Sequence, residues 1–204
     1  MNTRFGAILI APLAIITLSS PAQAEQFEGP FVGAAAGYNR DEIGPQLGDG
    51  AALPDELTAD AAYFQLFAGY DHAVAPKVRL GVEAAIGIGA EDELQLQDTS
   101  GSIKLDPEYS FEFTARAGYL VSDKALVYLR GGYQNSRVEA TLIETGSPTV
   151  RDADNADGWL AGGGLEYGFG DAIRTRVEYR YSDLGSGGAS WDRHQVLAGI
   201  LYNF

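Results

Sequence analysis

The sequence predicts an all-β fold, an eight-stranded antiparallel up-and-down transmembrane β-barrel. Three observations predict it. Eight runs of alternating residues are joined by short turns and long loops in strict alternation. Charged residues within a run fall on one face, because successive side chains in a strand point to opposite sides. Aromatic residues gather at both ends of the opposite, apolar face. An even number of strands with this pattern is typical of barrels that cross a bilayer.

Residues 1–24 are predicted to be a signal peptide. Arg4 supplies the positive start, residues 5–18 are apolar, and Ala22-Gln23-Ala24 is a small-residue cleavage motif. A retained membrane anchor is the alternative, but Pro12 interrupts the apolar run. We expect the mature chain to begin near Glu25 and residues 25–204 to form one barrel domain. No later stretch has the eighteen or more apolar residues of a membrane helix, a test that does not detect membrane-spanning strands.

Composition excludes several functions. The chain has no cysteine, so it contains neither a disulfide nor a thiol site. Its formal net charge of −14 argues against a nucleic-acid partner.

The expected strands follow one another closely along the chain. They span residues 30–39, 61–71, 78–88, 107–120, 125–136, 158–169, 173–181 and 193–204. Short turns are expected at 72–77, 122–124 and 170–172, the last being Gly170-Asp171-Ala172. The remaining connections, rich in Gly, Pro and Asp, read as long loops over 40–60, 89–106, 137–157 and 182–192.

The strand at 173–181 shows the segregation of charge most clearly. Its charged residues, Arg174, Arg176, Glu178 and Arg180, share one face, and Val177 and the tyrosines share the other. An arginine facing lipid near mid-bilayer costs about 2–4 kcal/mol, so the charged face must point into the barrel.

The aromatic residues predict two rings on the lipid face. With the N-terminus on the periplasmic side, the periplasmic ring contains Tyr70, Tyr119, Tyr167, Phe169, Tyr202 and Phe204. The outer ring contains Tyr38, Tyr109, Tyr133, Trp159, Tyr179 and Tyr181. Amphipathic rings favour the two membrane interfaces. A soluble lipocalin-like barrel would instead turn its apolar face inward.

The motifs Gly-Leu-Glu-Tyr at 164–167, Thr-Arg-Val-Glu-Tyr-Arg-Tyr at 175–181 and Leu-Tyr-Asn-Phe at 201–204 resemble the eight-stranded barrels of the outer-membrane protein A and opacity-type surface antigen group. The resemblance implies an outer-membrane location and insertion by the outer-membrane assembly machinery, which reads an aromatic-ended last strand. Tyr202 and Phe204 fit that assembly signal, and they also fit a simple lipid-facing role. The printed sequence stops at Phe204, so we expect no wall-tethering domain of the kind that longer members carry. Ala35 stands where such barrels often hold a long charged side chain.

Six charged residues are expected to form an interior charge layer. Five lie three to five residues from a periplasmic turn, and the sixth is one step higher. They are Glu83, Arg116, Arg130, Glu166, Arg176 and, higher, Glu178. One interpretation is a polar plug, since eight strands enclose a bore that side chains can fill. The other is a gated or selective pore.

No catalytic, cofactor or metal site is predicted. The two histidines, His72 and His194, lack an obvious serine partner, although Ser190 lies in the adjoining loop. The run from Asp152 to Gly158 departs from a calcium loop because Ala156 stands at position 5 of the pattern, where a ligand is required.

We therefore expect a monomeric structural surface protein, with loops that serve adhesion or envelope integrity. Its acidic loops would meet outer-membrane lipid and lipopolysaccharide, whose phosphates repel them unless divalent cations intervene. The alternative is a small porin-like channel for ions or small solutes. A lipid-modifying enzyme is a third hypothesis, which altered lipid A in cells carrying the protein would support.

Overall fold

The structure is a computed structural model. It describes residues 26–44, 46–47, 51–52, 57–90, 94–98, 101–144, 150–185 and 190–204. The predicted signal peptide, residues 1–24, lies outside the described residues. Within them, no helix is long and apolar enough to cross a membrane.

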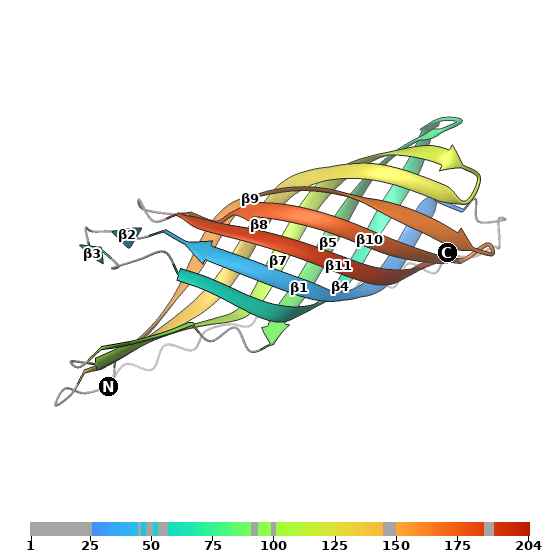
Figure 1. Cartoon of the computed structure of the whole chain (residues 1–204). Helices are drawn as coiled ribbons and strands as arrows, with labels where there is room; N and C mark the ends of the chain where they lie inside the picture. The colour runs from blue at the N-terminus through green and yellow to red at the C-terminus, as the bar shows by residue number, and fades with distance from the viewer. Residues whose placement is uncertain are drawn as a thin grey trace, which may run out of the picture.

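Eight long strands form a closed barrel (Figure 1). They are β1 (Gly29–Ile43), β4 (Leu57–Ala75), β5 (Val78–Ala90), β7 (Gly101–Ser122), β8 (Ala125–Glu144), β9 (Val150–Phe169), β10 (Ile173–Asp183) and β11 (Trp191–Asn203). Each pairs antiparallel with the next in this order, and β1 pairs with β11 to close the ring. The predicted fold class is confirmed.

All four predicted long loops are shorter in the structure, since β1 runs to Ile43, β4 begins at Leu57, β10 runs to Asp183 and β11 begins at Trp191. Two of them are wrong by much more. The segments expected as loops at 89–106 and 137–157 contain strand: β7 and β8 pair as far as Gly101↔Glu144, and β8 and β9 as far as Leu142↔Val150. A short strand, β6 (Leu94–Asp98), pairs with the start of β7. Beyond the bilayer neither face of a strand must be apolar, so the alternation of apolar and polar residues is lost from the sequence. Two strands that are already paired in register still gain backbone hydrogen bonds there, so the strands continue. Two further short strands, β2 (Gln46–Leu47) and β3 (Ala51–Ala52), pair with each other.

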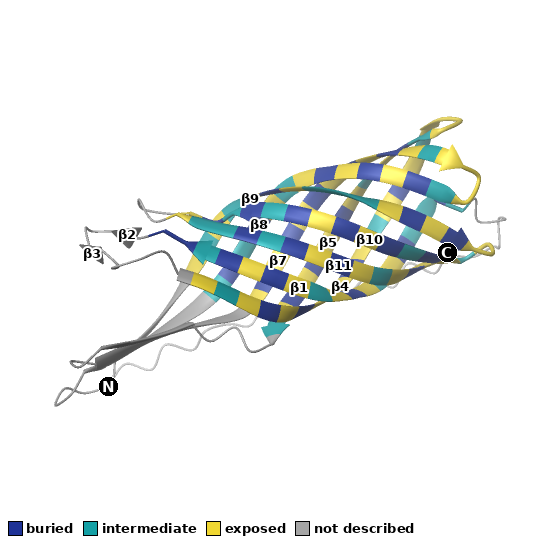
Figure 2. Cartoon of the chain, in the orientation of Figure 1, coloured by how far each residue is buried: buried dark blue, intermediate teal, exposed yellow. Residues whose placement is uncertain are grey.

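Burial alternates along the strands as predicted (Figure 2). In β10 the side chains of Arg174, Arg176 and Arg180 are at most 2% exposed, whereas Val177 is 59% exposed. Large apolar side chains from all eight strands are exposed on the outside, with values between 37% and 72%. In water such a surface would be a liability, whereas a bilayer requires it.

The exposed aromatic residues form the two predicted rings. Tyr119, Tyr167 and Tyr202 lie near the ends of their strands that meet the short turns, and Tyr38 and Tyr133 lie toward the long connections. All five are about half exposed. The short turns define the periplasmic end of the barrel and the long connections define the outer end.

The lumen has one apolar wall. Strands β1, β4, β5 and β11 contribute a cluster made of Phe31, Ala35, Tyr63, Phe67, Ala85, Leu197 and Leu201. The small residues of β1 make room for the rings of its neighbour. A Cβ atom at Gly33 would come within 2.4 Å of the Phe67 ring. The charged side chains approach this wall mainly from β7, β8, β9 and β10.

Candidate functional site: the filled lumen

The structure places all six residues of the interior charge layer inside the barrel. Each is at most 4% exposed: Glu83, Arg116, Arg130, Glu166, Arg176 and Glu178. They come from five strands, and closure of the barrel brings them into one network of ion pairs.

Glu83 on β5 is the first centre of this network. Its carboxylate lies 2.8 Å from Arg130, 2.8 Å from Arg176 and 3.6 Å from Arg116. Three guanidinium groups around one carboxylate offset the cost of burying its charge.

Glu166 and Glu178 are the second and third centres. Glu166 lies 2.8 Å from each of Arg116, Arg176 and Arg174. Glu178 lies 3.2 Å from Arg130, pairs with Arg180, and accepts a hydrogen bond from the hydroxyl of Tyr128. Every arginine of the layer thus contacts more than one carboxylate.

Four further charged residues that were not predicted as part of the layer belong to the network. Arg174 and Asp71, 3.3 Å apart, extend it toward the periplasm, where Asp71 also lies 3.0 Å from Arg116. Arg180 and Glu112, 2.6 Å apart, extend it toward the outer end. The alternation along residues 173–181 already assigned Arg174 and Arg180 to the inward face. Counting residues from the turns did not place these four residues in the layer. The long side chains of Arg174 and Arg180 reach charged groups at other depths in the lumen, which a count along the backbone does not show.

The guanidinium groups also lie over aromatic rings. Arg176 lies 4.5 Å from the centre of the Phe67 ring, and Arg116 lies 4.6 Å from that of Tyr128. All seven buried cations among the described residues are arginines. A planar, weakly hydrated guanidinium can bind carboxylates at its edge and an aromatic ring on its face, which an ammonium group cannot do as well.

The outer end of the lumen is closed by a second group of polar residues. Arg193 donates to both carboxylate oxygens of Asp41, at 2.6 and 3.0 Å, and the indole of Trp191 donates to Asp41 at 2.8 Å. Between this pair and the main network lies a cavity of about 10 Å³, whose lining includes Tyr63 and Ser110. That volume holds about one water molecule.

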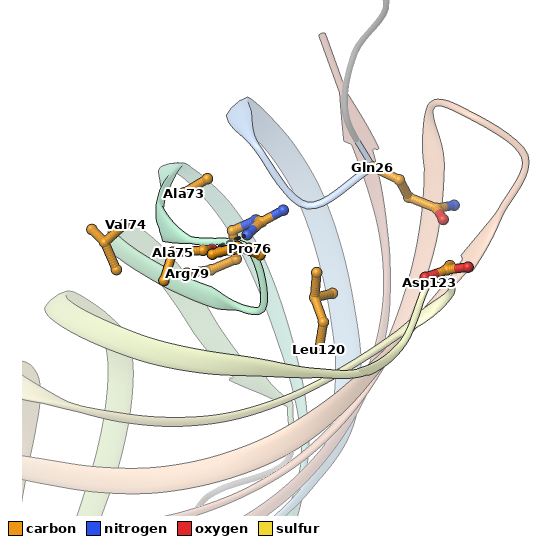
Figure 3. A pocket seen from close by; sticks show the side chains of 8 residues that line it. All are labelled: Gln26, Ala73, Val74, Ala75, Pro76, Arg79, Leu120 and Asp123. Atoms are coloured by element: carbon orange, nitrogen blue, oxygen red, sulfur yellow. Dashed lines mark hydrogen bonds between the residues drawn. The ribbon is translucent and has the colours of Figure 1, made fainter.

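A larger hollow of about 570 Å³ lies outside this filled region, at the periplasmic end (Figure 3). Ala73, Val74, Ala75, Pro76 and Arg79 of the β4–β5 hairpin form one side of it. Leu120 and Asp123 line it near the β7–β8 turn, and Gln26 lines it from the segment before β1. It opens outward from the barrel end.

The histidines do not assemble a hydrolase site in the described part of the chain. His194 Nδ1 lies 2.7 Å from the hydroxyl of Tyr179, and His72 lies 3.6 Å from the carboxylate of Glu28. Within the described ranges, no group of three or more acidic or histidine side chains could hold a metal ion. The side chains of Asp152 and Asp154, from the calcium-like run, lie outside the described residues.

A closed eight-stranded barrel with an apolar, aromatic-ringed outer surface and a charge-filled lumen defines an outer-membrane β-barrel. The chain belongs to the outer membrane protein beta-barrel domain family, whose model matches residues 10–204. It is a protein of the outer membrane.

Curated relatives and solved structures agree with this assignment. The chain is 28% identical over 204 residues to outer membrane protein A of Salmonella typhi, covering 97% of this chain and 55% of the relative. It is 29% identical over 160 residues to the 25 kDa outer-membrane immunogenic protein of Brucella ovis, covering 76% of this chain and 67% of the relative. The chain therefore spans about half the length of outer membrane protein A.

The outer membrane protein OprG of Pseudomonas aeruginosa shares the fold, with a TM-score of 0.55 and 13% identity over 89% of this chain and 98% of OprG.

Proposed function

We propose that the protein is a structural component of the outer membrane whose barrel does not conduct, and whose role lies in the extracellular part that the barrel carries. The observation that supports this proposal is the filled lumen. Buried charges are paired along the length of the lumen, from Arg174 near the periplasmic end to Arg193 near the outer end.

A conducting path would require these pairs to separate. The buried side chains of the described lumen include seven arginines and six carboxylates, a near balance in a chain whose formal net charge is −14. Removing one partner of a buried pair costs about 3–5 kcal/mol, because the remaining charge is left uncompensated. Spontaneous opening would break several pairs at once, so a plug agrees with this geometry better than a pore does.

The extracellular part is the surface on which we place the function. Strands β7, β8 and β9 continue beyond the outer aromatic ring as a paired sheet, visible at the left end of Figure 1. The sequence there is acidic, with Asp152, Asp154 and Asp157 in β9. We place adhesion or host contact on this acidic segment, or contact with lipopolysaccharide through bridging divalent cations.

We further propose that the protein acts as a monomer, is not an enzyme, and is inserted by the outer-membrane assembly machinery through a signal that includes Tyr202 and Phe204. Both rings are half exposed on the lipid face, and they contact each other edge to face with centres 5.1 Å apart.

Single-channel recording tests the proposal. Purified protein in planar bilayers should give no unitary current steps, with a general porin in the same bilayer as the positive control. The Arg176→Ala variant should remain silent or open only in brief bursts. Regular steps from the unmodified protein would overturn the structural reading and establish the channel alternative.

A second experiment tests the surface role. The extracellular hairpin of β8 and β9 is shortened by replacing residues 140–152 with a Gly-Ser turn, which removes the outer ends of both strands and leaves their membrane-spanning parts intact. Attachment of cells to a host-cell layer should fall while outer-membrane yield is unchanged. Equal attachment and equal envelope integrity for both proteins would contradict the proposal.

A further inference from the structure

The segment that precedes β1 crosses the periplasmic mouth of the barrel. Phe27 belongs to no strand, yet its side chain is fully buried. Its φ angle is +84°, and it is the one non-glycine residue with positive φ among the described residues. A bulky residue avoids this conformation unless its surroundings hold it there.

Three separate parts of the barrel rim hold this segment. Arg79 Nε on β5 donates to the Phe27 carbonyl oxygen at 2.9 Å. Asn203 on β11 donates to the carbonyl oxygen of Glu28 at 2.5 Å. Gln26 donates to the carbonyl oxygen of Gly170 in the β9–β10 turn. These anchors lie on different sides of the mouth, so the segment spans it.

The segment is also tied to the ion-pair network above it. The guanidinium of Arg174 lies 5.3 Å from the centre of the Phe27 ring. The same arginine donates to Asn203 Oδ1 at 2.8 Å, while the amide nitrogen of Asn203 holds Glu28. Phe27 therefore lies next to Arg174, the network arginine nearest the periplasm.

We propose that residues 26–29 are an N-terminal clasp that seals the periplasmic mouth. The Phe27 side chain fills the mouth. The carbonyl groups of Phe27 and Glu28 accept hydrogen bonds from β5 and β11, which hold the start of the first strand in place. The clasp closes the mouth with the Phe27 ring and with hydrogen bonds to backbone carbonyls, and none of these contacts is itself an ion pair, although Phe27 lies against Arg174 of the network. Gln26 and Arg79 both line the hollow of Figure 3, so displacement of the clasp would join that hollow to the lumen.

Thiol labelling measures the seal directly. The chain contains no cysteine, so Leu201→Cys introduces a single thiol. Leu201 is 1% exposed, faces the lumen, and lies directly across from Arg174 in the β10–β11 ladder. The full chain in lipid nanodiscs is treated with a charged, membrane-impermeant maleimide. We expect slow labelling in the Leu201→Cys parent, and labelling faster by about tenfold or more when Phe27→Ala is added, because the mouth then opens locally.

The matched control is Phe64→Ala in the same parent, since Phe64 is 49% exposed on the lipid face. It should leave the labelling rate unchanged. Should Phe27→Ala fail to fold, Phe27→Gly replaces it, because glycine adopts the positive φ without strain and still lacks the ring. Gel electrophoresis of unheated and heated samples identifies the folded barrel, which migrates differently from the heat-unfolded chain. The clasp is refuted if a folded Phe27 variant labels as slowly as the parent, or if the parent itself labels as fast as the unfolded chain.

Discussion

Arg176 and Glu83 form a two-pronged ion pair across the full width of the lumen. They lie 93 residues apart in the chain, and Arg176 Nη1 and Nη2 lie 3.1 and 2.8 Å from the two carboxylate oxygens. Strand β10 carries the arginine and strand β5 the glutamate. In the ring of eight strands these two are diametrically opposite. This pair joins the two halves of the barrel wall through its centre.

Arg176→Ala should therefore lower the free energy of unfolding by about 3–5 kcal/mol, because Glu83 and Glu166 each lose a buried partner. The measurement is the urea midpoint of the protein folded into lipid vesicles. Arg40→Ala is the control, since Arg40 and Asp60 form an ion pair that is largely exposed, and its midpoint should hardly move. An unchanged midpoint for Arg176→Ala would show that the network contributes nothing to stability.

Val177→Arg should impair folding, by about 2–4 kcal/mol if the position lies near mid-bilayer. Val177 is 59% exposed on the lipid face, one residue away from the buried Arg176. Val177→Leu, which keeps the surface apolar, is the matched control and should fold normally. The readout is the folded fraction after refolding into vesicles. Equal tolerance of arginine and leucine would mean that this face does not contact lipid.

Phe204→Ala should reduce outer-membrane yield in cells far more than refolding yield in vitro. The Phe204 ring is 54% exposed and its backbone nitrogen donates to Pro30 at 3.0 Å, so loss of the ring should cost the folded barrel only about 1–2 kcal/mol. Phe169→Ala is the control. Phe169 is an exposed residue on β9 that belongs to the same periplasmic set of aromatic side chains, and its replacement should leave the yield in cells unchanged. Normal cellular levels of Phe204→Ala would leave Phe204 as an ordinary interface residue.

Asp60 should remain ionised to unusually low pH. It lies two residues beyond the outer aromatic ring, opposite Arg40, whose hydrogen bonds at 2.8 and 3.2 Å lower the pKa of Asp60 from 3.8 to about 2. Because the folded pKa is depressed, the stabilisation from this pair is present above the unfolded pKa and is lost as pH falls through about 2. A carbon-13 NMR titration of the Asp60 carboxyl checks this. In the Arg40→Ala variant the titration midpoint of Asp60 should return toward 3.8. The same Asp60 midpoint in the variant and in the unmodified protein would contradict the pairing of Asp60 with Arg40.

The interior site was only partly predictable from the sequence. Alternation along β10 assigned Arg174, Arg176, Glu178 and Arg180 to one face, because side-chain direction in a strand is a local property with a period of two. The depth of each charge was estimated by counting from the nearest turn, which grouped Glu83 with Arg176. The same count separated Arg174 from them, although its guanidinium reaches Glu166 as closely as that of Arg176 does.

The clasp could not be predicted at all. Phe27 lies outside any alternating run, and nothing in the local sequence distinguishes it from a residue of a free N-terminal segment. The segment around it is held by Arg79, Gly170 and Asn203, which come to one rim only when the barrel closes.

The sequence by itself determined the number of strands, the end of the barrel at which the turns lie, and the face of each strand that meets lipid. Each of these follows from a repeat of two residues, from turn chemistry, or from the cost of a charge in hydrocarbon, and all act over a few neighbouring residues. Only the tertiary structure decided which charges become partners. Closing the barrel sets the stagger between strands, and that stagger brings Arg176 opposite Glu83 and the Phe27 ring beneath Arg174. Pairings of this kind depend on distances between residues far apart in the chain, which no local pattern encodes.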